Sequence, residues 1–105
     1  KGLAISGLAR SAIFPELPTV AEAALPGFAA GTWYGVLAPA GTPAASVSRV
    51  SDEIRKVLAL PEVGAALLAQ GVEPSGSTPG EFAAFIREDH AKWGRVIRDA
   101  GIKLE

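Results

Sequence analysis

The stretch that decides the fold runs from Thr32 to Pro43 and reads TWYGVLAPAGTP. Its first half, up to Ala38, combines two aromatic residues with Val and Leu, which favour the pleated surface of a β-sheet. Its second half, PAGTP, is rich in turn-forming residues. Thr42 is placed to cap a helix whose first residue is Pro43, because a proline there lacks only an N–H that the helix leaves unpaired. The stretch predicts a strand that turns directly into a helix.

A second strand is expected upstream, at residues 3–7, where apolar residues are followed by a glycine that ends the segment. The sequence LARSAIFPELP then forms a loop, because each proline keeps the residue before it extended. Thr19 opens a short helix, since Glu22 lies three residues further on and completes a capping box. Pro26 and Gly27 end that helix.

Three more helices are predicted downstream of the quoted stretch. They run from Pro43 to about Leu60, from Pro61 to Gly71 and from Pro79 to Ala100. A second capping box, formed by Thr78 and Glu81, begins the last helix, and Gly101 follows its end. Apolar residues recur on one face of each helix. They are Val47, Val50, Ile54, Val57 and Leu58, then Val63, Leu67 and Leu68, then Phe82, Phe85, Ile86, Trp93, Val96 and Ile97. The alternation of strands and helices predicts an α/β fold.

Composition excludes several classes of function. Ten basic and 11 acidic residues give a net charge of −1, so no basic surface for nucleic acid or an anionic membrane is expected. The absence of Cys and the single His exclude disulfides and most metal sites, and no cofactor motif is present. No apolar run approaches the roughly 20 residues of a membrane span. We expect no metal, no cofactor and no nucleic-acid partner.

Catalysis has little support in the sequence. The single His, His90, is preceded by Asp89, but adjacent residues of a helix do not face each other. No G-x-S-x-G motif, phosphate loop or spaced carboxylate pair is present. We therefore expect no catalytic residue and no enzyme activity. A small hydrolase that depends on His90 is the remaining enzymatic hypothesis.

The predicted strands are too few for the helices that they carry. Two or three strands do not make a stable sheet by themselves, and their edges need hydrogen-bonding partners. We expect the chain to be incomplete, so that missing segments or another copy of the chain pair with these edges. The sequence begins without Met in the strand-like segment KGLAISG, and the last two residues, 104–105, are interpreted as an expression-tag remnant.

Three segments resemble a known family in their order and spacing. They are RSAIFPELPTVAEAALPGF, TWYGVLAPAGTP and GSTPGEFAAFIREDHAKWGRVIRDAGIK. From Leu3 to Lys103 the chain resembles the C-terminal part of Bug-type extracytoplasmic solute receptors, the binding proteins of tripartite tricarboxylate transporters. The resemblance implies a portion of a two-lobe periplasmic-binding-protein (Venus flytrap) fold, with few strands and about four helices. Residues 1–30 then correspond to a remnant of the second lobe, with a crossover loop and a short helix, and residues 31–103 to the C-terminal part of the first lobe, a strand plus three helices.

The same resemblance implies a periplasmic location and two kinds of partner. The full-length parent would capture a small organic carboxylate and deliver it to the membrane subunits of a transporter. The first two thirds of the family's length, which include loops that hold the ligand carboxylate, are absent, so we expect the fragment alone not to bind ligand. The alternative is a self-associating α/β interaction domain without a small-molecule ligand, because uncovered strand edges and apolar faces favour a second copy.

Six residues are candidates for ligand contact: Gly7, Arg10, Ser11, Thr19, Trp33 and Tyr34. The first three lie in the loop at the carboxyl end of a predicted strand, where open α/β sheets place ligands. The N–H groups of the helix that follows Thr19 can receive an anion. The two aromatic residues line the cleft by resemblance. Structural alternatives remain for each group, namely a solvated Arg10, a Thr19 that only caps, and aromatic rings that pack under helices.

Asp89 falls inside the apolar face of the last helix, between Phe85 and Trp93. A carboxylate at such a position needs a partner, and Lys92, three residues further on, can supply one. In the family that the chain resembles, an acidic residue three positions before a Lys-Trp pair is usual. We interpret Asp89 as a structural residue and His90, at the edge of the face, as a surface residue.

Overall fold

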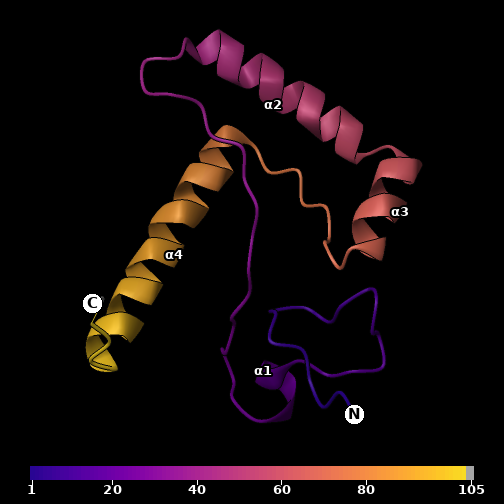
Figure 1. Ribbon diagram of the computed structural model, residues 1–105, viewed down its shortest axis with the longest axis vertical. Helices are drawn as coiled ribbons and strands as arrows, with labels where there is room; N and C mark the ends of the chain where they lie inside the picture. The colour runs from indigo at the N-terminus through magenta and orange to yellow at the C-terminus, as the bar shows by residue number, and fades with distance from the viewer. Residues whose placement is uncertain (104–105) are drawn as a thin grey trace. The chain divides into compact units, whose positions relative to one another are not determined.

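The computed structural model describes residues 1–103 and contains four helices within them (Figure 1). They are α1 (Val20–Ala23), α2 (Ala44–Leu58), α3 (Pro61–Ala69) and α4 (Pro79–Asp99). All four were predicted. Helices α3 and α4 begin at the predicted residues, and the remaining ends differ from the prediction by one to a few residues. The suspected tag remnant, 104–105, lies outside the described residues.

The chain consists of two compact units. The first comprises residues 1–39 and 62–74, so it holds α1 and nearly all of α3. The second comprises residues 40–61 together with the described chain from residue 75 onward, so it holds α2 and α4. Each unit is therefore built from segments that lie far apart in the sequence.

The two expected strands are not formed within residues 1–103. In the first unit Ile5 makes one isolated parallel bridge with Thr19, in which the Ile5 N–H donates to the Pro18 carbonyl at 2.8 Å and the Val20 N–H donates to the Ile5 carbonyl at 2.9 Å. The segment 32–38 belongs to no β-ladder. Because a strand exists only beside a segment that supplies its hydrogen-bonding partners, strand-forming residues alone did not suffice here.

Both predicted capping boxes are confirmed. At α1 the Thr19 hydroxyl accepts the Glu22 N–H at 3.1 Å, and the Glu22 carboxylate accepts the Thr19 N–H at 3.2 Å. At α4 the Thr78 hydroxyl accepts the Glu81 N–H at 3.3 Å, while the Glu81 carboxylate accepts the Thr78 N–H at 2.8 Å. Two otherwise unpaired backbone donors are satisfied at each helix start.

The start of α2 corrects the prediction by one residue. Pro43, expected as the first helical residue, is the N-cap, with φ −56° and ψ 134°, and it makes no side-chain cap hydrogen bond itself. Its extended ψ lies outside the helical range, although its carbonyl already accepts the Val47 N–H at 3.1 Å. Thr42 therefore lies outside the cap position. The predicted glycine terminators are confirmed, because Gly71 and Gly101 have φ of +78° and +64°.

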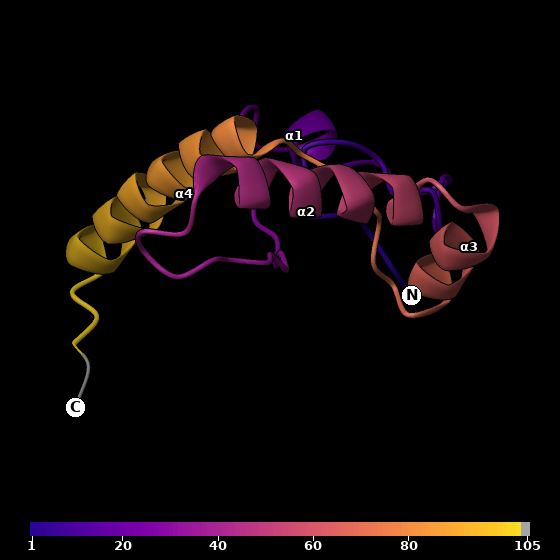
Figure 2. The ribbon, with the colours of Figure 1, turned by 90° about the horizontal axis from the view of Figure 1, so that it is seen from above.

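Apolar side chains remain uncovered in both units. Thr19, with 1 % of its surface exposed, is the one buried side chain among the described residues, and no apolar side chain there is buried. In the second unit α2 and α4, both labelled in Figure 2, contact each other. Val50 is nevertheless 54 % exposed and Phe85 43 % exposed. The expectation that these elements carry more apolar surface than they can cover is confirmed for residues 1–103.

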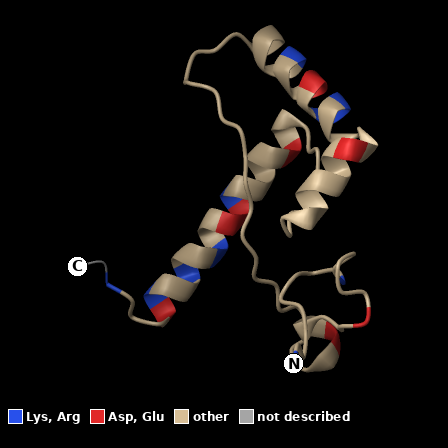
Figure 3. Ribbon diagram, turned by 45° about the vertical axis from the view of Figure 1, so that its right-hand side comes forward, with Lys and Arg blue, Asp and Glu red and all other residues tan. Residues whose placement is uncertain are grey.

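Charged residues of both signs are interspersed along α2 and α4 (Figure 3). On α2, Arg55 pairs with Asp52, and Lys56 pairs with Glu53 at 2.8 Å. The hydrogen bond and the charge of Glu53 raise the pKa of Lys56. These exposed pairs make the polar side of α2 soluble and contribute little to stability.

The capping box of α4 predicts how Glu81 titrates. The Thr78 N–H, the Thr78 hydroxyl and the charge of Arg55 lower the pKa of Glu81 below its ordinary value. Because the folded-state pKa is lowered, the cap stabilises the helix fully above the ordinary carboxyl pKa and loses this effect as the pH falls through the lowered value. The substitution Thr78→Ala removes one donor, so we expect a carbon-13 NMR titration of Glu81 to show a higher midpoint than in the wild type. An unchanged midpoint would contradict this reading of the cap.

Candidate functional site

The candidate site lies in the first unit, in the loop that connects Ile5 to α1. Here the Arg10 guanidinium donates through Nε to Glu22 Oε2 at 2.9 Å, and its Nη1 reaches the Pro15 carbonyl at 3.5 Å. The same Glu22 oxygen accepts the Thr19 N–H. Arg10 is therefore not simply solvated, as the structural alternative supposed. Arg10 forms an ion pair with Glu22, the acid of the α1 capping box, although the side chains of Arg10 and Glu22 remain about half exposed.

Ser11 is held by an acid from a distant part of the sequence. Its hydroxyl donates to Glu73 Oε1 at 3.1 Å, and the next residue, Ala12, donates its backbone N–H to the same oxygen at 3.0 Å. The Ser11 oxygen also accepts the Ile13 N–H at 3.1 Å. Ser11 and Ala12 thus share one carboxylate oxygen, and Ile13 is linked to it through the Ser11 hydroxyl. Glu73 was not among the residues predicted from the sequence, because no local signal indicates a partner about 60 residues away.

Thr19 is the most constrained of the six candidates. It is buried, it caps α1, and its backbone pairs with Ile5. The Thr19 hydroxyl is engaged with the Glu22 N–H at 3.1 Å. The role of helix cap is therefore established, and a contact with ligand stays a prediction.

Gly7, Trp33 and Tyr34, the remaining three candidates, are described by their backbone neighbours and their exposure. Gly7 follows Ser6, whose carbonyl accepts the Ala30 N–H at 2.8 Å, so this part of the loop lies beside the segment that leads toward the aromatic residues. A Cβ at Gly7 would lie 3.4 Å from the Ala9 carbonyl oxygen. Tyr34 is 80 % exposed and Trp33 40 % exposed. The alternative that these rings pack under helices is not realised for Tyr34 in this chain.

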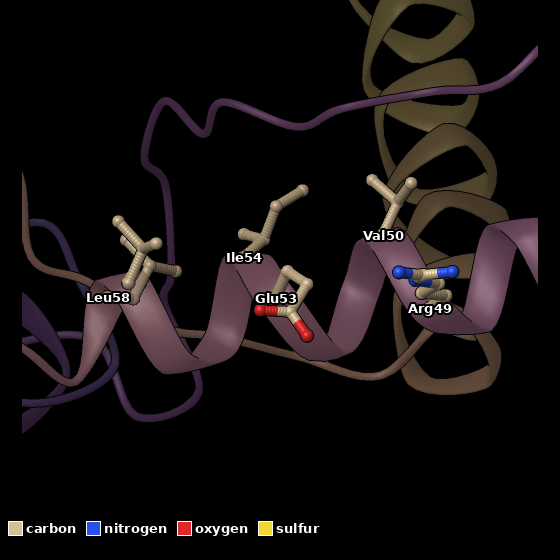
Figure 4. A pocket seen from close by; sticks show the side chains of 6 residues that line it. Arg49, Val50, Glu53, Ile54 and Leu58 are labelled. Carbon is tan, nitrogen blue, oxygen red and sulfur yellow. The ribbon is translucent and has the colours of Figure 1, made fainter.

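The second unit carries a shallow hollow along a single helix. It is lined by the α2 residues Arg49, Val50, Glu53, Ile54, Val57 and Leu58. In Figure 4 Val50 and Ile54 project from the same side of the helix, while Arg49 and Glu53 mark its polar border. None of the six predicted site residues belongs to this surface. It is an uncovered apolar face rather than an enclosed ligand site.

The remaining residues considered from the sequence lie on α4. Lys92 places its Nζ 5.0 Å from the centre of the Trp93 ring, a cation–π distance. Asp89 is half-exposed, and its pairing with Lys92 stays a prediction. His90 is exposed, as expected. Over residues 1–103 no three His, Cys, Asp or Glu side chains gather in a way that could hold a metal ion.

The donors of the loop are engaged by acids of the chain itself. The Arg10 guanidinium contacts Glu22, while the Ser11 hydroxyl and the Ala12 N–H donate to Glu73. A ligand contact of these residues stays a prediction. The described helices include none that is long and apolar enough to cross a bilayer.

Known structures define the class of protein to which this arrangement belongs. The chain is similar to the R. palustris protein Rpa4515, solved with adipate, with a TM-score of 0.76 and 31 % sequence identity. The similarity covers 94 % of this chain and 33 % of that protein. The chain thus corresponds to a portion of a two-lobe periplasmic-binding-protein fold.

The chain belongs to the family of tripartite tricarboxylate transporter receptors, whose family model matches residues 1–102. It is 41 % identical over 98 residues to a UPF0065 protein encoded in the tcbD-tcbE intergenic region of Pseudomonas sp. strain P51. It is 36 % identical over 105 residues to Protein BugT of Bordetella pertussis. These alignments cover 92 % and 100 % of this chain but 29 % and 32 % of the relatives. The resemblance to Bug-type receptors is confirmed, and the chain spans about a third of their length. The family is one of solute receptors and not of enzymes.

The contribution of the Thr19 hydroxyl to the helix start can be separated from that of the side-chain volume. The substitution Thr19→Val keeps the shape of the side chain but removes the cap acceptor, and we expect a cost of about 1 kcal/mol at the start of α1. Amide hydrogen exchange at Glu22 should then accelerate roughly fivefold, while Thr19→Ser should keep the wild-type rate. Equal rates in all three proteins would show that the hydroxyl does not hold this helix end.

Proposed function

We propose that this chain is the C-terminal part of a periplasmic solute receptor whose full-length form captures a small organic carboxylate for a tripartite tricarboxylate-type transporter. The observation that carries the proposal is the family match over residues 1–102, combined with a length about one third that of the relatives. A receptor of this kind needs no catalytic group, and we propose no enzyme activity for it. Its partners are the carboxylate and the membrane subunits of the transporter.

In this proposal residues 1–30 belong to the second lobe of the receptor and residues 31–103 to the first. The lobes close about a hinge and trap the ligand between them. The uncovered apolar side chains of α2 and α4 support the proposal, because such faces require a further layer of structure. The chain spans about a third of the length of its relatives, so in this proposal it does not bind the ligand by itself.

The ligand class follows from the family and from a similar structure. The family model is a tripartite tricarboxylate transporter receptor, and the similar R. palustris protein was solved with adipate, so a small carboxylate is the proposed ligand. The net charge of −1 argues against a strongly basic cleft and favours recognition through neutral N–H and O–H donors and ordered water. Adipate, which the similar R. palustris protein holds, is the first dicarboxylate to test.

Titration calorimetry of the full-length receptor tests this function. The panel consists of adipate, shorter dicarboxylates, tricarboxylates, amino acids and aromatic acids. We expect saturable heat with at least one acid and none with the 105-residue chain alone. If every acid in the panel gives no saturable heat with the full-length receptor, the proposed function is wrong.

A second candidate function is a self-associating interaction domain without a small ligand. The specific observation in its favour is the exposure of the apolar α2 face, where Val50 is 54 % exposed and Val57 is 48 % exposed. A second copy of the chain would cover this face without any other lobe. The two functions differ in what completes the fold, namely the rest of the parent or an identical chain.

Light scattering of the 105-residue chain across a dilution series separates the two candidates. If copies associate through α2, Val50→Lys should weaken association by about tenfold or more, because burying a Val side chain contributes about 1.5–3 kcal/mol. Ser48→Lys is the matched control, since it adds the same charge at an exposed position two residues away, about 200° around the helix. A monomeric mass at every concentration would exclude the self-association function.

A further inference from the structure

We infer that residues 62–74 move together with residues 1–39 as one body, and that the two units of the chain turn against each other at Gly41 and Gly76. This inference rests on the proposed function, because such a turn would open and close the receptor cleft. It refines the proposed lobe boundary. The boundary then falls after residue 39, and residues 62–74 join the lobe that holds residues 1–30.

The chain passes between its two units at three places, and each passage directly follows a proline. The boundaries lie after Pro39, Pro61 and Pro74. Proline has no N–H and disfavours a helical conformation of the residue before it, so a continuous helix does not carry rigidity across such a point. Boundaries between separately folded bodies typically fall in segments rich in Pro and Gly. All three passages therefore have the composition of a hinge.

Two of the three passages also contain a glycine in the left-handed region. Gly41 has φ +83° and lies two residues after Pro39, and Gly76 has φ +67° and lies two residues after Pro74. Glycine adopts positive and negative φ with similar ease, whereas a residue with a Cβ does not. Hinges require residues that absorb large changes of φ and ψ. We therefore place the turning points at these two glycines.

Glu73 fastens residues 62–74 to the N-terminal part of the chain. Its Oε1 accepts the Ser11 hydroxyl at 3.1 Å and the Ala12 N–H at 3.0 Å. Glu73 immediately precedes Pro74, so this tie lies directly beside a passage between the units. Because both donors are engaged by an acid of the chain itself, the tie needs no ligand. Residues 62–74 would then follow residues 1–39 when the second unit turns.

Double electron–electron resonance on the full-length receptor without ligand tests which segments move together. Nitroxide labels are attached, two at a time, through Glu16→Cys in the first unit, Ser48→Cys on α2 and Gln70→Cys directly after α3, all at exposed positions. We expect a narrow distance distribution between labels 16 and 70, and broader distributions for both pairs that include label 48.

Two results would overturn the inference. A narrow distribution between labels 48 and 70 with a broad one between labels 16 and 70 would show that residues 62–74 move with α2. Three equally narrow distributions would show that the units do not turn. If no acid binds the full-length receptor in calorimetry, the proposed function fails, while the label distances still decide which segments form one body.

The substitution Gly41→Ala tests the hinge itself. A Cβ there would meet no heavy atom within 4 Å, so the change acts through the backbone conformation. The left-handed conformation at residue 41 should lose about 5- to 30-fold in population, and the distribution between labels 16 and 48 should shift. Gly27→Ala is the matched control, because Gly27 has φ +81° and equally open surroundings but lies inside the first unit. A distribution that Gly41→Ala leaves unchanged would exclude Gly41 as a hinge and overturn the inference.

Discussion

A polypeptide segment cannot become a β-strand by itself, because its backbone donors and acceptors must be paired with a neighbouring segment. The organisation of this chain depends on that constraint. Residues 3–7 find a single bridge, at Thr19, and residues 32–38 belong to no ladder within the described chain. Helices are different, since their hydrogen bonds are internal. The four helices therefore form in the isolated chain, while the sheet that would carry them does not.

The same constraint explains the burial of side chains. An amphipathic helix such as α2 or α4 forms from local signals, but its apolar face needs a second layer to remove it from water. Here Val50, Phe85 and Trp93 remain 37–54 % exposed, although α2 and α4 contact each other.

In the first unit two carboxylates organise a loop that has little other support. Glu22 combines the cap of α1 with an ion pair to Arg10, and Glu73 gathers the donors of Ser11 and Ala12. Both contacts are exposed to solvent, so they order the loop without burying it.

The sequence alone determined the elements whose causes are local. The capping boxes at Thr19 and Thr78, the left-handed glycines after α3 and α4, and the apolar faces were all readable, because each depends on residues within one or two turns. The family was readable from three spaced segments, and the match over residues 1–102 confirms it. Only the tertiary structure decided which strand-forming segments lack partners, how exposed Tyr34 is, and which acid holds Ser11. These features depend on groups that lie tens of residues apart, and a distance of that kind leaves no periodic signal in the sequence.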